Sequence, residues 1–136
     1  MQSISAVVLT SIIVWTMFLL ILMEGLRVRF LLTKTVAANE FKPDNSNLPP
    51  FMQRLARAHA NCIESFPIIG GLLVVALLTG QTGVTDPQAP WLLVARLAQS
   101  SIHFVSTSIV AANLRFAAFA VQIAIAVYWS WQLLAT

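Results

Sequence analysis

An uninterrupted apolar segment from Ile4 to Met23 constrains the fold of this chain more than any other feature of its sequence. The segment contains no charged side chain, and its length matches the roughly 20 residues that a helix needs to cross a bilayer. No basic residue precedes it and no A-x-A cleavage site follows it, so it lacks the marks of a signal peptide. We therefore interpret it as part of a membrane-spanning helix.

The composition of the whole chain agrees with a membrane location. Of the 136 residues, 58% are hydrophobic and only 10% are charged, whereas a soluble domain typically has about a quarter charged residues. We predict an all-α integral membrane protein with a single domain over residues 1–136. Cys62 is the only cysteine, which excludes an intrachain disulfide and a zinc cage, and we expect no metal site. The basic residues flank the apolar segments, so we expect no nucleic-acid partner.

Apolar segments and loop residues together predict a four-helix bundle in the membrane. We expect its helices at about residues 4–32, 51–79, 91–108 and 113–134. In this arrangement all of the eight basic residues except Arg96 lie at or near one membrane face. Because basic residues favour the cytoplasmic side, we expect a multi-pass protein with both termini outside. The short loops favour a bacterial inner membrane.

Polar residues recur at helical spacing in the second predicted helix. Arg57, Asn61 and Glu64 fall on one stripe of that helix, together with Arg54. An ionised group at the bilayer centre costs about 2.5 to 3.5 kcal/mol, so such side chains should face the bundle and be paired. Two interpretations are equally open: an Arg–Glu clamp between helices, and a ligand site.

The third and fourth predicted helices carry further polar residues. We expect Arg96 to snorkel to the outer interface, about five residues away, and His103 to be a hydrogen-bonded core residue. Arg115 and Arg27, taken alone, are anchors on the cytoplasmic side. However, one set of side chains belongs near the cytoplasmic side of the same bundle, where it would attract a polyanion. This set is Arg27, Arg57, Asn61, Glu64 and Arg115.

Residues 57–67 read R-A-H-x-N-x-x-E-x-x-P. This pattern resembles the signature of the MAPEG family, the membrane-associated proteins in eicosanoid and glutathione metabolism. The order of features is also similar to that family: a first span ending in Arg27 and Arg29, a polar loop, the signature helix, a third helix with an arginine and a fourth that opens with one. The resemblance covers nearly the whole chain.

The resemblance implies a homotrimer of four-helix bundles in the lipid bilayer. It implies that glutathione binds between neighbouring subunits at the cytoplasmic half, and that a hydrophobic small-molecule substrate arrives from the bilayer. By match to the family pattern, Arg115 would be the catalytic residue that stabilises the thiolate. The implied glutathione contacts are Arg27, Arg57, Asn61, Glu64 and His103.

Three functional hypotheses follow from the residues and the resemblance. The first is a glutathione-dependent membrane transferase or peroxidase that acts on hydrophobic electrophiles or lipid hydroperoxides. The second is a non-catalytic scaffold or lipid-binding protein on the same fold, because His103 and Phe119 stand where family enzymes commonly carry tyrosines. The third and weakest is a channel or transporter component with a polar path along the bundle.

Overall fold

The structure is a computed structural model that describes residues 3–135. Throughout residues 3–135 the regular structure is helical, with no strand, which confirms the predicted all-α class. The elements are α1 (Ile4–Leu32), α2 (Pro50–Leu78), α3 (Thr82–Thr85), α4 (Ala89–Val105) and α5 (Ile109–Leu134). The short helix α3 lies in a segment that the sequence predicts as a loop, so the described residues contain one helix more than expected.

Serine side chains set the beginnings of two of the long helices. The hydroxyl of Ser3 accepts a hydrogen bond from the Ala6 amide at 3.1 Å, and α1 begins directly after it. Ser108 caps α5 in the same way, so α5 begins at Ile109 and not at the predicted Asn113. A capping serine satisfies an N–H group that has no partner within the helix. As a result, only residues 106–108 join α4 to α5.

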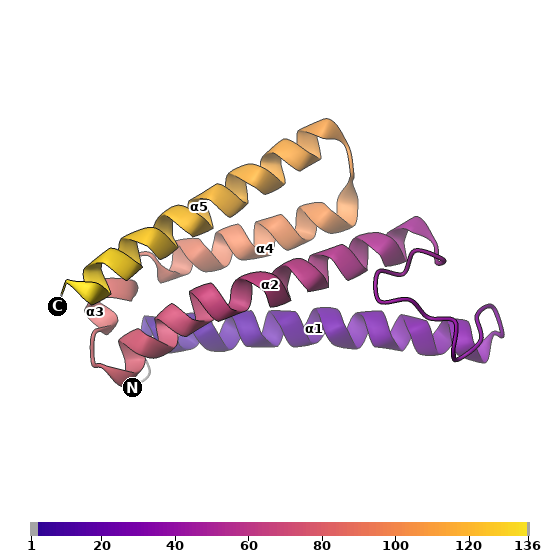
Figure 1. Ribbon diagram of the computed structural model, residues 1–136, viewed down its shortest axis with the longest axis horizontal. Coiled ribbons are helices and arrows are strands. Elements are labelled where there is room, and N and C mark those ends of the chain that lie inside the picture. The colour runs from indigo at the N-terminus through magenta and orange to yellow at the C-terminus, as the bar shows by residue number, and fades with distance from the viewer. Residues whose placement is uncertain (1–2, 136) are drawn as a thin grey trace.

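The four long helices run side by side along the molecule (Figure 1). The start of α1 and the end of α5 lie at one end, and the loop between α1 and α2 lies at the other, together with the α4–α5 connection. Helix α1 packs against α2 and α4, while α5 packs against α4 and α2. Arg27, Arg57 and Arg115 therefore lie toward the end that carries the α1–α2 loop and the α4–α5 connection, as the sequence predicts. We call this end the loop end.

The outer surface of the bundle is apolar. Helices α1, α2 and α5 are long and apolar enough to cross a membrane. Large side chains such as Ile21 and Phe116 are 68% and 71% exposed, and extended apolar surface of this kind marks contact with lipid. The chain is thus an integral, multi-pass membrane protein. Helix α4, with 17 residues, is not one of these three candidates, and its full crossing stays a prediction.

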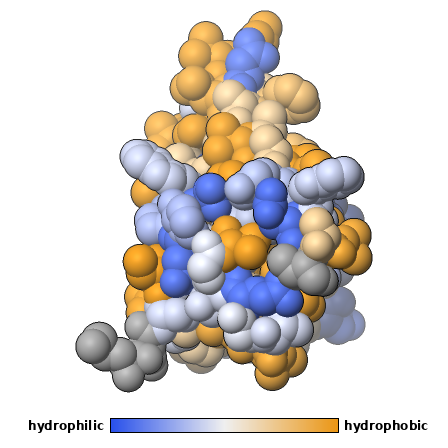
Figure 2. All heavy atoms as spheres, turned by 90° about the vertical axis from the view of Figure 1, so that its left-hand side faces the viewer, coloured by the Kyte–Doolittle hydropathy of each residue, from blue (hydrophilic) through white to orange (hydrophobic). Residues whose placement is uncertain are grey.

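Hydrogen bonds hold the α2–α4 connection at the end of the molecule where α1 begins and α5 ends. Figure 2 shows hydrophilic residues gathered over this end and apolar residues around it. Asp86 Oδ1 accepts hydrogen bonds from the backbone amide of Ser5 at 2.8 Å and from its hydroxyl at 2.5 Å. Trp129 Nε1 donates to Gln88 Oε1 at 3.2 Å. The segment after α2 is therefore joined to both α1 and α5.

Replacement of Asp86 by alanine is expected to destabilise the protein. The substitution leaves the buried Ser5 amide without its acceptor, which costs about 1–3 kcal/mol. We expect a lower melting temperature in detergent micelles, measured by tryptophan fluorescence. The exposed loop residue Glu40 provides the control, since Glu40→Ala should leave the melting temperature unchanged. Equal melting temperatures for the two variants would show that the Asp86 contacts add nothing to stability.

Candidate functional site

A buried arginine joins α4 to α2 in the middle of the bundle. Arg96 is 0% exposed. Its Nη1 donates to Ser65 Oγ at 2.6 Å, and its Nη2 donates to Asn61 Oδ1. The prediction that Arg96 snorkels to the interface is therefore wrong. The physical reason is that α2 presents two polar acceptors, four residues apart, directly opposite the guanidinium, which compensates for its removal from water.

A pair of glutamines continues the polar contacts from α4 to α5. Gln122 Nε2 donates to Gln99 Oε1 at 2.8 Å, and both side chains are buried. Among the buried side-chain nitrogen and oxygen atoms of residues 3–135, those without a hydrogen-bond partner are Gln122 Oε1, Arg96 Nε and Trp15 Nε1. The sequence pattern did not place Ser65 or Gln122 in the site. The available signal for Gln122 was an amide in the middle of an apolar stretch of α5, which tertiary structure has to satisfy.

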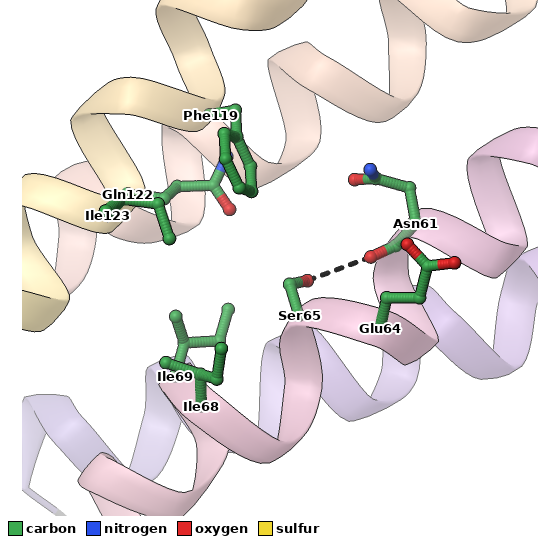
Figure 3. Close-up of a pocket in the computed structure, with 8 residues that line it drawn as sticks. All are labelled: Asn61, Glu64, Ser65, Ile68, Ile69, Phe119, Gln122 and Ile123. Carbon is green, nitrogen blue, oxygen red and sulfur yellow. Dashed lines mark hydrogen bonds between the residues drawn. The ribbon is translucent and has the colours of Figure 1, made fainter.

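A cavity of about 150 Å³ lies between α2 and α5. We call it the α2–α5 cavity, and Figure 3 shows its lining residues: Asn61, Glu64, Ser65, Ile68, Ile69, Phe119, Gln122 and Ile123. The Gln122 side chain points from α5 into this space, while Ser65 donates to the Asn61 carbonyl oxygen at 3.0 Å. The cavity thus combines apolar walls with a few buried polar atoms.

Arg115 and His103 form a second polar pair at the loop end of α4 and α5. Arg115 Nη1 lies 3.0 Å from His103 Nδ1. A guanidinium can only donate, so Nδ1 is the acceptor and the ring proton of a neutral imidazole sits on Nε2. The imidazole of His103 is therefore in direct contact with the Arg115 guanidinium.

Arg27 is held by the loop that joins α1 to α2. Its Nε and Nη2 donate to Asn45 Oδ1 at 3.0 and 2.7 Å, and its Nη1 forms an ion pair with Glu24 at 2.8 Å. Asn45 is buried with φ 57° and also donates to the Met52 carbonyl oxygen at 2.8 Å. The asparagine tolerates this left-handed conformation better than most residues do. Arg27 thereby fixes the loop against the start of α2.

A larger cavity of about 410 Å³ lies between α1 and α2. We call it the α1–α2 cavity, and its lining residues are Leu20, Met23, Glu24, Arg27, Pro43, Ala56, His59, Ala60, Ile63 and Glu64. The volume is within the range of about 300–1,000 Å³ that is typical of small-molecule sites. Arg27 and Glu64 carry charges of opposite sign in its wall.

The structure does not gather the six predicted site residues at one place. Glu64 lines both cavities, with Arg27 beside it in one and Asn61 beside it in the other. His103 and Arg115 contact each other but line neither cavity. Arg57 is exposed on α2. A single chain therefore does not bring all six side chains to one point.

Removal of the Ser65 hydroxyl is expected to weaken the link between α2 and α4. Ser65→Ala deprives the buried Arg96 guanidinium of an acceptor, and a hydrogen bond to a charged group contributes about 1.5–3 kcal/mol. We expect a lower melting temperature by tryptophan fluorescence in detergent. Ser101→Ala, at an exposed position of α4, is the matched control. If Ser65→Ala and this control have the same melting temperature, the contact between Ser65 and Arg96 adds nothing to stability.

Comparison with known proteins places the chain in one family. The model of the MAPEG family matches residues 5–135, which is nearly the whole chain. No curated protein and no solved structure matches it. The match agrees with the apolar spans of the structure and confirms the resemblance that residues 57–67 indicate. The chain is a member of the MAPEG family, and hence a membrane protein of the kind found in glutathione and eicosanoid metabolism.

Proposed function

We propose that this protein is a glutathione-dependent membrane transferase or peroxidase that acts on hydrophobic electrophiles or lipid hydroperoxides. One observation carries the proposal. Charged side chains of both signs line the α1–α2 cavity, on two helices that are long and apolar enough to cross a membrane. Charges inside a membrane segment are costly and are found mainly at functional sites. Membership of the MAPEG family supports the same function.

The residues around the α1–α2 cavity fit glutathione in size and charge. The tripeptide carries two carboxylates and one ammonium group at neutral pH. Arg57 on the exposed face of α2 and Arg27, which already pairs with Glu24 in the cavity wall, are the positive charges proposed for the carboxylates, and Glu64 supplies negative charge for the ammonium. Asn61, three residues before Glu64, lines the neighbouring α2–α5 cavity, and its side-chain oxygen is already held by Arg96. Its amide N–H groups are therefore the part that can donate to a ligand.

The exposure of the charged stripe on α2 favours assembly with further copies of the chain. Glu64 lies about 21 Å along α2 from its first residue, well inside a spanning helix, and it is exposed in the single chain. Contact of an ionised carboxylate with lipid at that depth would cost a few kcal/mol. Because Arg115 also lines neither cavity, we propose a homotrimer in which a neighbouring copy covers the stripe and supplies its Arg115.

Arg115 is the proposed catalytic residue. Glutathione, when bound, supplies the sulfur nucleophile, which reacts as the thiolate. The Arg115 guanidinium stays protonated at all relevant pH values, so its positive charge favours the thiolate over the thiol. Its hydrogen bond to His103 at 3.0 Å fixes the orientation of the side chain. His103 thus positions Arg115. Because its imidazole ring is neutral, it does not offset the positive charge of the guanidinium.

A non-catalytic lipid-binding protein is the second candidate. The observation that favours it is Phe119, which is 37% exposed beside the α2–α5 cavity and offers no hydroxyl group to a polar ligand. Calorimetric titration with glutathione separates the two candidates. Stoichiometric binding at millimolar concentration supports the enzyme, and its absence supports the lipid-binding protein.

Replacement of Arg115 by alanine is expected to lower turnover much more than glutathione affinity. Loss of one preorganised electrostatic contact to a developing charge typically lowers kcat by about 100-fold or more. The rate is measured by conjugation of a hydrophobic aryl halide, and the affinity by calorimetry. Arg29→Ala, at an exposed position beyond the cavities, should change neither quantity. If Arg115→Ala conjugates as fast as the unmodified protein, the proposed role of Arg115 is wrong.

Mixed oligomers test whether a neighbouring copy supplies Arg115. We expect Arg115→Ala and Glu64→Gln to be impaired as separate proteins, since each lacks one part of every site. Co-expression of the two variants should restore activity above that of either, because some subunit pairs then combine an intact Glu64 with an intact Arg115. No recovery in purified mixed oligomers would mean that each chain uses its own Arg115.

A further inference from the structure

An apolar groove lies between α1 and α4, apart from the two cavities described above. We call it the α1–α4 groove, and its walls are one stripe of α1, from Thr10 to Phe18, and Leu93 and Leu97 of α4. Its volume is about 540 Å³, and it shares no lining residue with the α1–α2 or the α2–α5 cavity. The two hydroxyl groups on the stripe donate to backbone carbonyls of α1 itself. Val14 and Phe18 are 53% and 49% exposed, so the groove is open to the lipid around the bundle.

A row of aromatic rings continues the α1–α4 groove toward the loop end. The Trp15 ring stacks on Phe18 with centroids 5.5 Å apart and lies 6.4 Å from the ring of Phe104. The Phe104 ring in turn lies 6.4 Å from that of Phe51 at the start of α2. From Leu93 to Phe104 the distance along α4 is about 16 Å. One leaflet of the hydrocarbon core is about 15 Å deep, so the groove and the rings together have the length of an acyl chain in one leaflet.

Arg54 of α2 stands at the loop end of this row of rings. Its Nε donates to the Phe104 carbonyl oxygen at 2.8 Å. Within residues 3–135 this is its only hydrogen bond, and the one ion pair there joins Arg27 to Glu24. Both Nη groups of Arg54 are therefore available as donors. Arg54 lies about 6 Å from the first residue of α2, which is about 43 Å long. Because the hydrocarbon core is about 30 Å thick, this part of α2 lies at the level of the lipid head groups.

We propose that the α1–α4 groove binds an anionic phospholipid, with one acyl chain along the aromatic row and the phosphate at Arg54. Guanidinium N–H groups form charge-assisted, often bidentate hydrogen bonds with phosphate oxygens. A zwitterionic lipid has the same phosphate and the same chains, but its ammonium group offsets the negative charge. The site therefore prefers a lipid with a net negative charge. It shares no residue with the proposed glutathione site, and binding there does not require glutathione.

The test uses lipids with brominated acyl chains as probes and Trp15 as the reporter, since bromine quenches the fluorescence of a tryptophan that the chain contacts. The protein is placed in phosphatidylcholine nanodiscs that contain increasing fractions of brominated phosphatidylglycerol, which is anionic, or of brominated phosphatidylcholine. The Trp15 signal is the difference between the unmodified protein and Trp15→Phe, which keeps an aromatic ring. We expect phosphatidylglycerol to quench Trp15 at about a fivefold lower fraction, the typical effect of one arginine near anionic lipid. The tryptophans left in Trp15→Phe should show no such preference: Trp91, Trp129 and Trp131.

The variant Arg54→Gln removes the charge and keeps an amide that can donate to the Phe104 carbonyl oxygen. We expect the preference for phosphatidylglycerol to disappear in this variant and to persist in Arg29→Gln, which removes an exposed charge near the end of α1. Equal quenching of Trp15 by the two lipids in the unmodified protein would overturn the proposal even if Arg54→Gln does not fold. So would an equal loss of preference in Arg29→Gln, which would indicate attraction to the basic end as a whole. Since glutathione is absent throughout, none of these results depends on the outcome of the conjugation assay.

Discussion

The buried guanidinium of Arg96 is the contact on which the arrangement of the polar residues depends. A charge inside a membrane bundle is tolerated only where neighbouring groups replace its hydration. Here Asn61 and Ser65 of α2 accept its hydrogen bonds, so α4 is held against α2 at one rotation and one depth. This placement turns Asn61 and Ser65 toward α5 and away from α1. The α2–α5 cavity is therefore a consequence of how a single charge is satisfied.

Much of the fold and part of the site follow from local sequence patterns. A charge-free segment such as Ile4–Met23 predicts a spanning helix because the bilayer leaves few alternatives. The stripe of Arg57, Asn61 and Glu64 follows from spacings of four and three residues, which place side chains on one face of any α-helix. Both predictions need only the helical period and the cost of charge in lipid.

The remaining features depend on contacts between distant segments, which periodicity does not describe. Arg96 lies near the predicted outer end of its helix, and from that position alone snorkelling costs less than burial. Burial becomes favourable only once Asn61 and Ser65 stand opposite, residues more than thirty positions away. Gln122 pairs with Gln99 for the same kind of reason. The hydrogen bonds from Arg27 to Asn45 depend on a left-handed backbone conformation of Asn45, which the composition of the loop does not specify.

Helix α2 separates two environments, and Glu64 lies at their boundary. One face of α2 meets α1 and borders a cavity with charges of both signs, and another meets α5 and borders a smaller, mostly apolar cavity. The charged cavity and the mostly apolar cavity thus lie on two sides of the same helix, and the Glu64 carboxylate borders both. In the proposed enzyme this arrangement would allow a water-soluble and a lipid-soluble reactant to approach one helix, each from the phase in which it dissolves.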